Sequence, residues 1–231
     1  MRVSPATGTF GPMPPNPWFS WDYVQQNWSD IADALRIHTT MTIEAVLIAL
    51  VIAVPLSALA VRVRWLSGVI VGTASVLYTI PSLALFAILA PIVGIGREPV
   101  LIGVVMYALL VLIRNTIAGL QGVDPDVVDA ARGLGYGPSR RLWLVEMPNA
   151  LPGIVAGLRL ATVSTVALVT VGAVVGYGGL GQLMFRGFQT FYRPEIVTAT
   201  LLCLLLAVVL DALLWALGRA LTPWLRERSA A

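Results

Sequence analysis

Long apolar stretches separated by short polar segments make up most of this chain. A transmembrane helix needs ~20 mostly apolar residues to cross the hydrocarbon core of a bilayer. Five stretches meet that requirement, at roughly 40–61, 66–93, 99–118, 152–177 and 196–218. Lipid offers the backbone no hydrogen-bond partners, so each stretch is expected to be helical. The pattern therefore predicts an all-α integral membrane protein with about five transmembrane helices.

Proline residues interrupt the first two apolar stretches, at Pro55 and Pro81. A proline inside a helix frees a backbone carbonyl and bends the helix. In the second stretch several hydroxyl groups surround the proline, and a bend there can widen a path through the membrane. Tyr78, Pro81 and Ser82 are therefore candidates for the translocation path. A bend that serves only helix packing explains the same residues equally well.

If the chain crosses the membrane five times, its arginines are divided unequally between the two sides of the membrane. With the N-terminus outside, the inner segments hold Arg62, Arg64, Arg132, Arg140, Arg141, Arg219, Arg226 and Arg228. The outer segments then hold Arg2, Arg36, Arg97, Arg186 and Arg193. Cytoplasmic loops carry an excess of basic residues. The distribution predicts an outer N-terminus and a cytoplasmic C-terminus, and it places the polar loop at 119–151 in the cytoplasm.

The composition agrees with a membrane protein and excludes a Walker A phosphate loop in this chain. Of its 231 residues, 58% are hydrophobic and 12% charged, and the mean hydropathy is +0.84. A soluble domain carries about 25% charged residues. All 15 basic residues are arginine, whereas a P-loop needs a lysine to reach the phosphates. The chain is therefore expected to be a non-catalytic subunit without a cofactor, and any ATP and Mg belong to a partner ATPase.

Residues that usually build metal sites and disulfides are scarce. His38 is the only histidine and Cys203 the only cysteine. A lone histidine does not form a histidine-based metal site, and a lone cysteine has no partner within the chain. The net charge of +3 is divided among the loops, which does not favour nucleic-acid binding. The sequence predicts neither a metal site nor contact with nucleic acid.

The polar loop contains start and stop signals for two short helices. The sequence Asp124-Pro125-Asp126 supplies a capping side chain, a proline for the first turn and a negative charge near the positive end of the helix dipole. It predicts a short helix over about 125–134. Glycines within 133–137 can end that helix, and Pro138 starts a second one that leads toward residue 148.

A spaced pattern runs through this loop. It consists of Asp-Ala-Ala, three residues, Gly, nine residues, Val, one residue and Met-Pro. The positions are Asp129, Ala130, Ala131, Gly135, Val145, Met147 and Pro148. With Glu, Ile and Leu in place of the Asp, Val and Met, this is the pattern of the cytoplasmic coupling loop of ATP-binding-cassette importer permeases. The loop closely resembles the part of those permeases that their ATPase grips.

The resemblance implies a role for four of these positions. Ala130 and Ala131 would allow a motor subunit to approach closely, Gly135 would permit a sharp exit, and Asp129 would hydrogen-bond across the contact. The arginines of the loop can pair with acidic groups of the motor or with lipid phosphates. An ordinary basic cytoplasmic loop is the alternative that the composition alone leaves open.

The resemblance extends to segments 79–86 (TIPSLALF), 114–116 (RNT), 122–135 and 176–181 (GYGGLG). These segments are similar to the osmoprotectant branch of the permeases, whose members import glycine betaine, choline, carnitine or similar quaternary ammonium compounds. The resemblance implies the type I importer permease fold in a bacterial plasma membrane. It also implies three partners: ATPase subunits, a second permease subunit that is identical or paralogous, and an extracytoplasmic solute-binding protein. In this family the binding protein carries the aromatic cage that recognises the cation.

The expected organisation has three parts. Residues 1–39 form an extracytoplasmic or interfacial segment, in which the stretch 21–36 suits an amphipathic helix at the membrane surface. Residues 40–218 form the transmembrane permease domain, including the coupling loop at 119–151. Residues 219–231 form a cytoplasmic tail.

The segment GYGGLG has the glycine spacing of a dinucleotide-binding motif, but its context is wrong. An apolar stretch precedes it and no βαβ unit surrounds it. The glycines are expected to end the fourth span and to let residues 179–193 fold back at the outer surface. Gly178 and Gly179 are candidates for a gate in the translocation path, and a simple connecting segment is the alternative.

Asp211 places a charge inside the fifth apolar stretch, where an unpaired charge is costly. Arg159 and Arg114 are expected at similar depth and can pair with it. We expect a structural ion pair here rather than a proton or substrate site. Gly153 and Gly157 have the small-xxx-small spacing that favours close helix packing.

The expected function is the permease subunit of an osmoprotectant importer, and two alternatives stay open. A permease of the same architecture can carry methionine or another amino acid. A secondary transporter or channel would need coupling carboxylates or inverted repeats near the midplane. The sequence offers only Asp211, which lies off-centre.

Overall fold

The computed structural model describes residues 16–223, and these form helices joined by short connections without any strand. This confirms the all-α prediction. Of the expected three parts, residues 1–15 of the N-terminal segment and 224–231 of the tail lie outside the described residues.

Within residues 16–223, four helices are long and apolar enough to cross a membrane. They are α2 (Trp28–Arg62), α5 (Arg97–Gln121), the continuous helical stretch Pro138–Val175 that contains α8 (Met147–Val171), and α10 (Arg193–Leu221). The pair α3 (Arg64–Thr79) and α4 (Ser82–Val93) passes the same test together, although it is bent by 95°. Counting this pair as one span gives five, in agreement with the predicted number.

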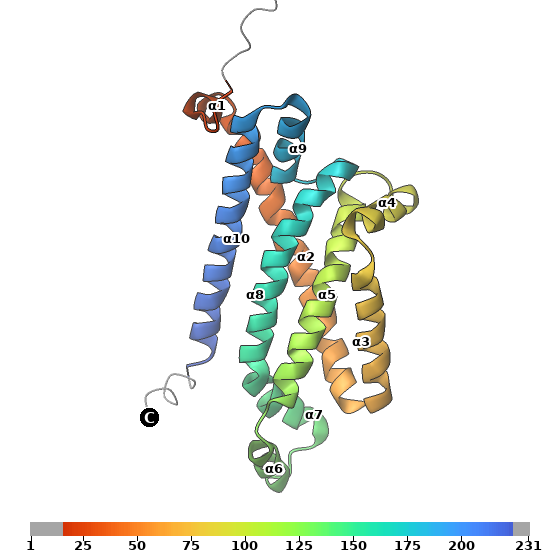
Figure 1. Ribbon diagram of the computed structural model, residues 1–231. Helices are drawn as coiled ribbons and strands as arrows, with labels where there is room; N and C mark the ends of the chain where they lie inside the picture. Colours follow the sequence, from red (N-terminus) through yellow and green to blue (C-terminus); the bar gives the residue numbers. More distant parts are fainter. Residues whose placement is uncertain (1–15, 224–231) are drawn as a thin grey trace, which may run out of the picture.

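Short helices lie at the two ends of the long ones (Figure 1). At one end are α1 (Trp21–Gln26) and α9 (Leu180–Thr190), and a 3-10 turn over Gly172–Val175 precedes α9. At the other end are α6 (Pro125–Gly133) and α7 (Pro138–Arg141), followed by a π-helical turn over Leu142–Glu146. The first described residues lie at the α1 end, and α10 finishes at the α6 end (Figure 1).

The N-terminal helix differs from its prediction. The stretch 21–36 is not one surface helix, because the chain breaks at Asn27 and α2 then runs without interruption from Trp28 into the first span. The Asn27 side-chain amide donates to the Tyr23 carbonyl at 2.9 Å and closes α1. Ser20 caps the other end of α1, where its hydroxyl accepts from the Tyr23 amide at 3.2 Å. Local capping by Ser20 and Asn27 therefore divides the stretch 21–36, which the sequence pattern predicts to be one helix.

The bend between α3 and α4 occurs at Pro81, as the sequence predicts, but it is far sharper than a kink within one helix. Pro81 has extended backbone angles, with φ −56° and ψ 134°. The Tyr107 hydroxyl donates to the carbonyl of Ile80 at this corner. The second apolar stretch is thus two helices that meet at a corner rather than one continuous helix.

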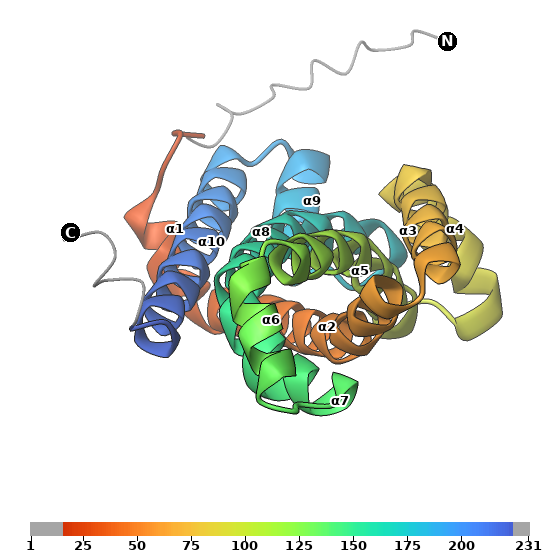
Figure 2. The same ribbon diagram turned by 90° about the horizontal axis from the view of Figure 1, so that it is seen from below.

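Three helices, α2, α5 and α8, form the centre of the molecule. Viewed along the bundle, α10 lies on one side of this centre and α3 with α4 on the other (Figure 2). The largest buried apolar cluster includes Met41, Ala45, Ala49, Ala53, Phe86, Val100, Val104, Ala108, Leu112, Ile113, Ala161 and Val169. The small residues of α2 in this cluster permit close packing against α5, as small side chains do between membrane helices.

The backbones of α5 and α8 come closest where glycine faces glycine. A Cβ added to Gly153 would lie 2.8 Å from the Gly119 Cα, and one added to Gly119 would lie 2.8 Å from the Ala150 carbonyl oxygen. One turn further along α8, a Cβ on Gly157 would lie 2.4 Å from the Asn115 Cβ. The small-xxx-small spacing therefore serves helix packing, as expected.

We predict that Gly153→Ala lowers the stability of the protein. Overpacking costs about 1–3 kcal/mol, and this outweighs the gain of about 1 kcal/mol from replacing glycine by alanine inside a helix. Gly72→Ala is the matched control, because an added Cβ there meets no atom within 4 Å. Thermal unfolding in detergent, followed by circular dichroism, should show a lower midpoint for Gly153→Ala and an equal or higher one for Gly72→Ala. Equal midpoints for the two variants would contradict the assigned contact.

Candidate functional site

The connection between α5 and α8, residues 122–146, projects beyond the end of the long helices (Figure 1). We call it the α5–α8 connection. An apolar cluster fixes both of its ends to the bundle, and the buried members of that cluster are Ala58, Leu120, Val123, Leu142, Met147, Ala150 and Ile154. The connection therefore begins and ends in packed core, and its middle is presented to the surroundings.

Local hydrogen bonds determine the limits of α6. The Asp124 carboxylate accepts from the Asp126 amide at 2.9 Å and caps the start. Gly135, with a φ of +77°, turns the chain at the other end. There the Tyr136 amide donates to the Ala131 carbonyl at 3.1 Å, which satisfies a free acceptor of the last turn. The predicted start signal and the predicted glycine stop are both present.

The residues of the spaced pattern fall into two groups. Ala131 and Met147 are buried, and Met147 belongs to the apolar cluster that fixes the connection to the bundle. Asp129, Ala130 and Gly135 are exposed on the projecting part. Val145 and Pro148 are intermediate, and Pro148 lies in the first turn of α8. The pattern thus combines residues that hold the connection in place with residues that a partner can touch.

Large apolar side chains are exposed beside the patterned residues. Leu134 is 76% exposed, Trp143 56% and Leu144 59%. The Asp129 carboxylate accepts from the Arg132 guanidinium at 2.8 Å, so both charges stay on the outer side of α6. Exposed apolar side chains with charged neighbours are typical of a surface that another protein covers.

A buried carboxylate, Glu146, joins parts of the connection that are distant in sequence. The Arg141 Nε donates to Glu146 Oε1 at 2.6 Å, and the Arg62 Nη2 lies 4.0 Å from Glu146 Oε2. The Arg62 Nη2 also donates to the Pro138 carbonyl at 2.5 Å. We call Arg62, Arg141 and Glu146 the Glu146 cluster. Because a buried charge needs a partner, this cluster holds the C-terminal end of α2 against α7 and the start of α8.

The sequence analysis did not single out Glu146. The available signal was a lone carboxylate inside an apolar run, LWLVEMP at 142–148. Such a residue needs a cationic partner, and the arginine pair at 140–141 lies one helical turn away. Nothing in the sequence indicated the contact between Glu146 and Arg62, because the two residues are far apart along the chain.

The gate candidates Gly178 and Gly179 lie at the opposite end of the molecule from α6. A Cβ on Gly179, whose φ is +53°, would lie 2.7 Å from the His38 Cβ. A Cβ on Gly178 would lie 2.5 Å from the Ala173 nitrogen. These glycines let the chain before α9 pack directly on α2, and no strand accompanies them anywhere in residues 16–223, so the dinucleotide-binding interpretation has no βαβ unit to support it.

The path candidates Tyr78, Pro81 and Ser82 lie at the corner between α3 and α4. The Tyr78 ring stands edge-on to the Tyr107 ring, with centroids 5.5 Å apart. Gly178 and Gly179 line a separate hollow of about 270 Å³ next to the first turns of α2. The structure does not bring the two groups into one cavity, and their role in transport stays a prediction.

An ion-pair cluster connects α1, α2, α9 and α10 at this same end. The Arg186 Nε donates to the buried Glu195 Oε1 at 2.5 Å, and Arg186 Nη1 lies 3.6 Å from Asp30 Oδ2. Burial and the negative charge of Glu195 raise the pKa of Tyr23 to about 12. Burial is the largest single influence on the pKa of Arg186 and acts to lower it, but the hydrogen bonding and electrostatic attraction of Glu195 and Tyr23 together outweigh burial, and the net shift is upward. At neutral pH the Tyr23 hydroxyl and the Arg186 guanidinium therefore both stay protonated, which is their ordinary form.

Asp211 forms a two-pronged pair with Arg159. The Arg159 Nε and Nη2 donate to the two carboxylate oxygens at 2.8 and 2.7 Å, joining α8 to α10. Arg114, the other candidate partner, donates instead to the Ser75 hydroxyl at 3.0 Å. The pair holds two helices together at the depth where an unpaired charge would be costly.

Comparison with known proteins gives a family match over most of the chain. Residues 28–227 match the family described as binding-protein-dependent transport system inner membrane component. The osmoprotectant import permease protein OsmW of Salmonella typhimurium is 38% identical over 206 residues, which cover 87% of this chain and 96% of that protein. The choline transport system permease protein OpuBB of Bacillus subtilis is 33% identical over 202 residues, covering 87% of this chain and 93% of that protein.

Solved structures support the fold. A chain of the MetNI methionine ABC transporter in an inward-facing conformation superposes with a TM-score of 0.71 at 22% identity, covering 88% of this chain and 100% of that one. A chain of an amino acid ABC transporter solved with histidines superposes with a TM-score of 0.73 at 18% identity, covering 87% and 98%. The predicted type I importer permease fold is confirmed.

Glu146→Gln is expected to loosen the α5–α8 connection. Removing one partner of a buried ion pair costs about 3–5 kcal/mol, and the arginines here retain some solvent contact, so we expect about 1.4 kcal/mol, or about tenfold in local opening. Limited trypsin digestion of the purified protein should therefore cleave after Arg140 and Arg141 about tenfold faster.

The matched control is Asp129→Asn, which removes the other carboxylate–arginine pair of the connection. Asp129 and Arg132 are both exposed, and exposed pairs contribute little to stability. The cleavage rate should stay near that of the unmodified protein. If Asp129→Asn accelerated digestion as much as Glu146→Gln, the structural importance of the Glu146 cluster would be refuted.

Proposed function

This chain belongs to the family of binding-protein-dependent transport system inner membrane components, and we propose that it is the permease subunit of an ATP-driven importer of osmoprotectants. The observation that carries the proposal is the α5–α8 connection: a loop anchored at both ends that keeps the spacing of the coupling pattern, with Asp, Val and Met in place of its Glu, Ile and Leu, and exposes Asp129, Ala130 and Gly135. The solutes in view are quaternary ammonium compounds such as glycine betaine, choline and carnitine.

The solute class rests on the relatives rather than on a cavity. OsmW is named an osmoprotectant import permease and OpuBB a choline transport permease, and each aligns with this chain over most of its own length. The methionine and amino acid transporters superpose well, but at 18–22% identity they bear on the fold alone. An amino acid permease therefore has weaker support as the alternative.

ATP and Mg are proposed to bind a separate ATPase subunit, because this chain has no lysine for a P-loop. The ATPase would grip the exposed side of α6, where Ala130 permits close approach, and would cover Leu134 and Trp143. A second permease subunit, identical or paralogous, would complete the translocation path. An extracytoplasmic binding protein would deliver the solute at the α1 and α9 end.

The proposed orientation follows from the same arrangement. The α5–α8 connection and the end of α10 lie together at one end of the molecule, while α1 and α9 lie at the other (Figure 1). Because the ATPase works where ATP is, the connection must be cytoplasmic. The first described residues are then outside and the end of α10 inside, which agrees with the excess of arginine expected in cytoplasmic segments.

The geometry suggests how movement of the ATPase reaches the membrane. A displacement of α6 acts on α5 and α8, whose backbones touch at Gly119 and Gly153, and on α2 through the Glu146 cluster. These three helices would tilt together. ATP binding shifts the equilibrium between the inward-open and outward-open states. The size of this shift is limited to the difference between the free energies with which ATP binds the two states. The rigid connection is what allows this difference to act across the membrane.

We predict that Ala130→Arg abolishes retention of the ATPase by a protein that still folds. Ala130 is exposed on a surface helix, so arginine is accommodated in the free chain, but the new charge would be buried against the ATPase. A mismatched charge at an interface costs several kcal/mol, and 1.4 kcal/mol is already tenfold in affinity. Co-purification from native membranes should therefore fall by more than about tenfold.

Thr190→Arg is the matched control, since it adds the same side chain at an exposed position at the far end of α9. It should retain the ATPase as the unmodified protein does. Equal retention by all three proteins would show that α6 is not the contact. Absence of any ATPase from the unmodified protein, even after crosslinking, would favour a secondary transporter instead.

The solute is tested by uptake. Cells that lack their other osmoprotectant importers and express the complete transporter should take up labelled glycine betaine. Choline or carnitine should compete if they share the binding protein, whereas methionine should not. The Ala130→Arg variant should reduce uptake by the same factor as ATPase retention. Uptake of methionine without uptake of any quaternary ammonium compound would overturn the solute assignment and leave the importer architecture standing.

A further inference from the structure

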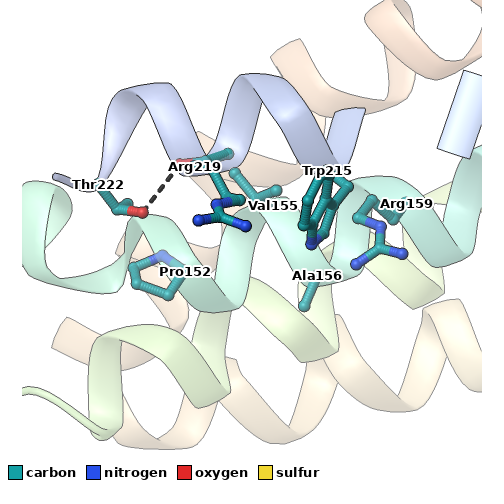
Figure 3. A pocket seen from close by; sticks show the side chains of 8 residues that line it. Pro152, Val155, Ala156, Arg159, Trp215, Arg219 and Thr222 are labelled. Atoms are coloured by element: carbon teal, nitrogen blue, oxygen red, sulfur yellow. Dashed lines mark hydrogen bonds between the residues drawn. The ribbon is translucent and has the colours of Figure 1, made fainter. Parts of the chain in front are cut away.

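Two arginines, Arg114 and Arg159, lie within the predicted spans, and the structure gives them different partners. Arg159 lines a hollow of about 180 Å³ between α8 and α10 (Figure 3), and its charge is compensated by the two hydrogen bonds to the Asp211 carboxylate. Arg114 of α5 has a neutral partner, because its Nη2 donates to the Ser75 hydroxyl of α3 at 3.0 Å. Within residues 16–223 no carboxylate forms an ion pair with Arg114.

The Arg114 guanidinium keeps most of its hydrogen-bonding capacity. Ser75 donates its own hydrogen to the Val71 carbonyl at 2.6 Å, so it offers Arg114 only an acceptor. A guanidinium carries five N–H donors in a planar fork, and the Ser75 oxygen takes one of them. Arg114 is exposed, and its other donors have no acceptor in the part of the chain that the structure describes. The arginine can therefore bind a further group, and its charge favours an anion.

The Arg114 guanidinium lies well inside the spanning region rather than at its edge. α3 starts at Arg64, at the end of the molecule that carries α6, and runs toward α4 (Figure 1). Ser75 follows eleven residues later, or about 16 Å along the helix at about 1.5 Å per residue. α5 runs in the opposite direction, and helical side chains lean toward the N-terminus of their own helix. The Arg114 side chain therefore extends away from the nearer headgroup level.

The face of α3 that carries Ser75 differs from a surface that faces lipid. Gly68, Gly72, Ser75 and Thr79 recur at intervals of three or four residues and share this face. A Cβ added to Gly68 or Gly72 meets no atom within 4 Å, so the face is open. Large apolar side chains cover α10 instead, including Leu201, Leu204, Leu205, Val208 and Leu213. Charged residues inside a membrane almost always face the bundle interior or a water-filled cavity, and the open face beside Arg114 suits such a cavity.

We propose that Arg114 lines the translocation path and binds the carboxylate of a zwitterionic solute such as glycine betaine or carnitine. This role rests on the proposed function, which supplies the solute class. A guanidinium binds a carboxylate through two parallel N–H···O hydrogen bonds. Choline carries a quaternary ammonium group with a hydroxyl in place of the carboxylate, so it gains nothing from this contact. Arg114 therefore selects zwitterions over choline within the path.

Tyr78 offers a contact for the other charge of such a solute. Its side chain is 45% exposed, and it lies three residues beyond Ser75, about 4.5 Å further along α3 on the same side. A quaternary ammonium group is attracted to the face of an aromatic ring. The contacts at Ser75 and Tyr78 are thus about one turn apart, a spacing that suits a small solute with both charges.

The first test is uptake of labelled glycine betaine and labelled choline by cells that express the complete transporter and lack their other osmoprotectant importers. In Arg114→Gln the maximal rate for glycine betaine should fall about tenfold, which corresponds to about 1.4 kcal/mol. The half-saturating concentration should stay unchanged, because the binding protein captures the solute. The rate for choline should change by less than about twofold, since choline has no carboxylate contact to lose. Arg114→Lys, which keeps the charge without the planar fork, should recover part of the glycine betaine rate.

A purely structural role for Arg114 gives a different result. Loss of the bond to Ser75 would then slow the two solutes by the same factor and would lower the thermal unfolding midpoint of Arg114→Gln. Equal slowing of the two solutes, or an unchanged glycine betaine rate, overturns the proposal. In a transporter that carries zwitterions only, an Arg114→Lys rate no higher than that of Arg114→Gln overturns it as well. An unmodified transporter that carries only choline would do the same.

The second test asks whether the α3 face borders water. Cysteines introduced by Gly72→Cys and Thr79→Cys, each in a Cys203→Ala background, lie about one turn on either side of Ser75. In native membranes with the complete transporter they should react with a water-soluble thiol reagent, because the reactive form of a thiol is the thiolate. Val208→Cys is the matched control, since Val208 is 57% exposed in the middle of α10 and should not react. Reactivity no higher than that of Val208→Cys would show that the α3 face borders no water and would overturn the proposal.

The role of Arg114 and the importer function fail in different ways. Cells that take up no quaternary ammonium compound through the unmodified transporter would contradict the proposed function, and the solute contact at Arg114 with it. Cells in which Arg114→Gln imports glycine betaine at the unmodified rate would leave the importer standing and remove only the role of Arg114. Arg114→Gln should retain the ATPase, because Arg114 lies outside the α5–α8 connection.

Discussion

The close approach of the α5 and α8 backbones at Gly119 and Gly153 is the contact on which the rest of the arrangement depends. Neither position has room for a side chain, so the two helices leave the bundle as a fixed pair. α2 packs against both of them, and α6 and α7 lie just beyond the contact. A force on the α5–α8 connection therefore acts on a packed unit of three long helices rather than on a flexible linker.

Charged contacts then determine which helices are neighbours at each level. The Glu146 cluster joins α2 to the start of α8, Arg159 with Asp211 joins α8 to α10, and Arg186 with Glu195 joins α9 to α10. A carboxylate removed from water needs its arginine. Inside lipid, hydrophobic contact alone does not distinguish one packing of apolar helices from another. The ion pairs do, and they therefore disfavour the alternative packings.

The peripheral helices have a different character from the central three. α10 contacts α8 and α9 but leaves most of its surface uncovered, and α3 with α4 forms a sharp corner on the other side (Figure 2). Surfaces of this kind are available to lipid and to other subunits.

The sequence by itself determined the features that depend on local interactions. Apolar lengths gave the spanning helices, and Asp124, Pro125 and Gly135 gave the limits of α6, because capping and turn geometry involve neighbouring residues. Tertiary structure decided the 95° corner at Pro81 and the choice of Arg159 over Arg114 as the partner of Asp211. It also decided the burial of Glu146 beside Arg62. These features join residues far apart along the chain, and only the packing of the helices brings such side chains within reach of one another.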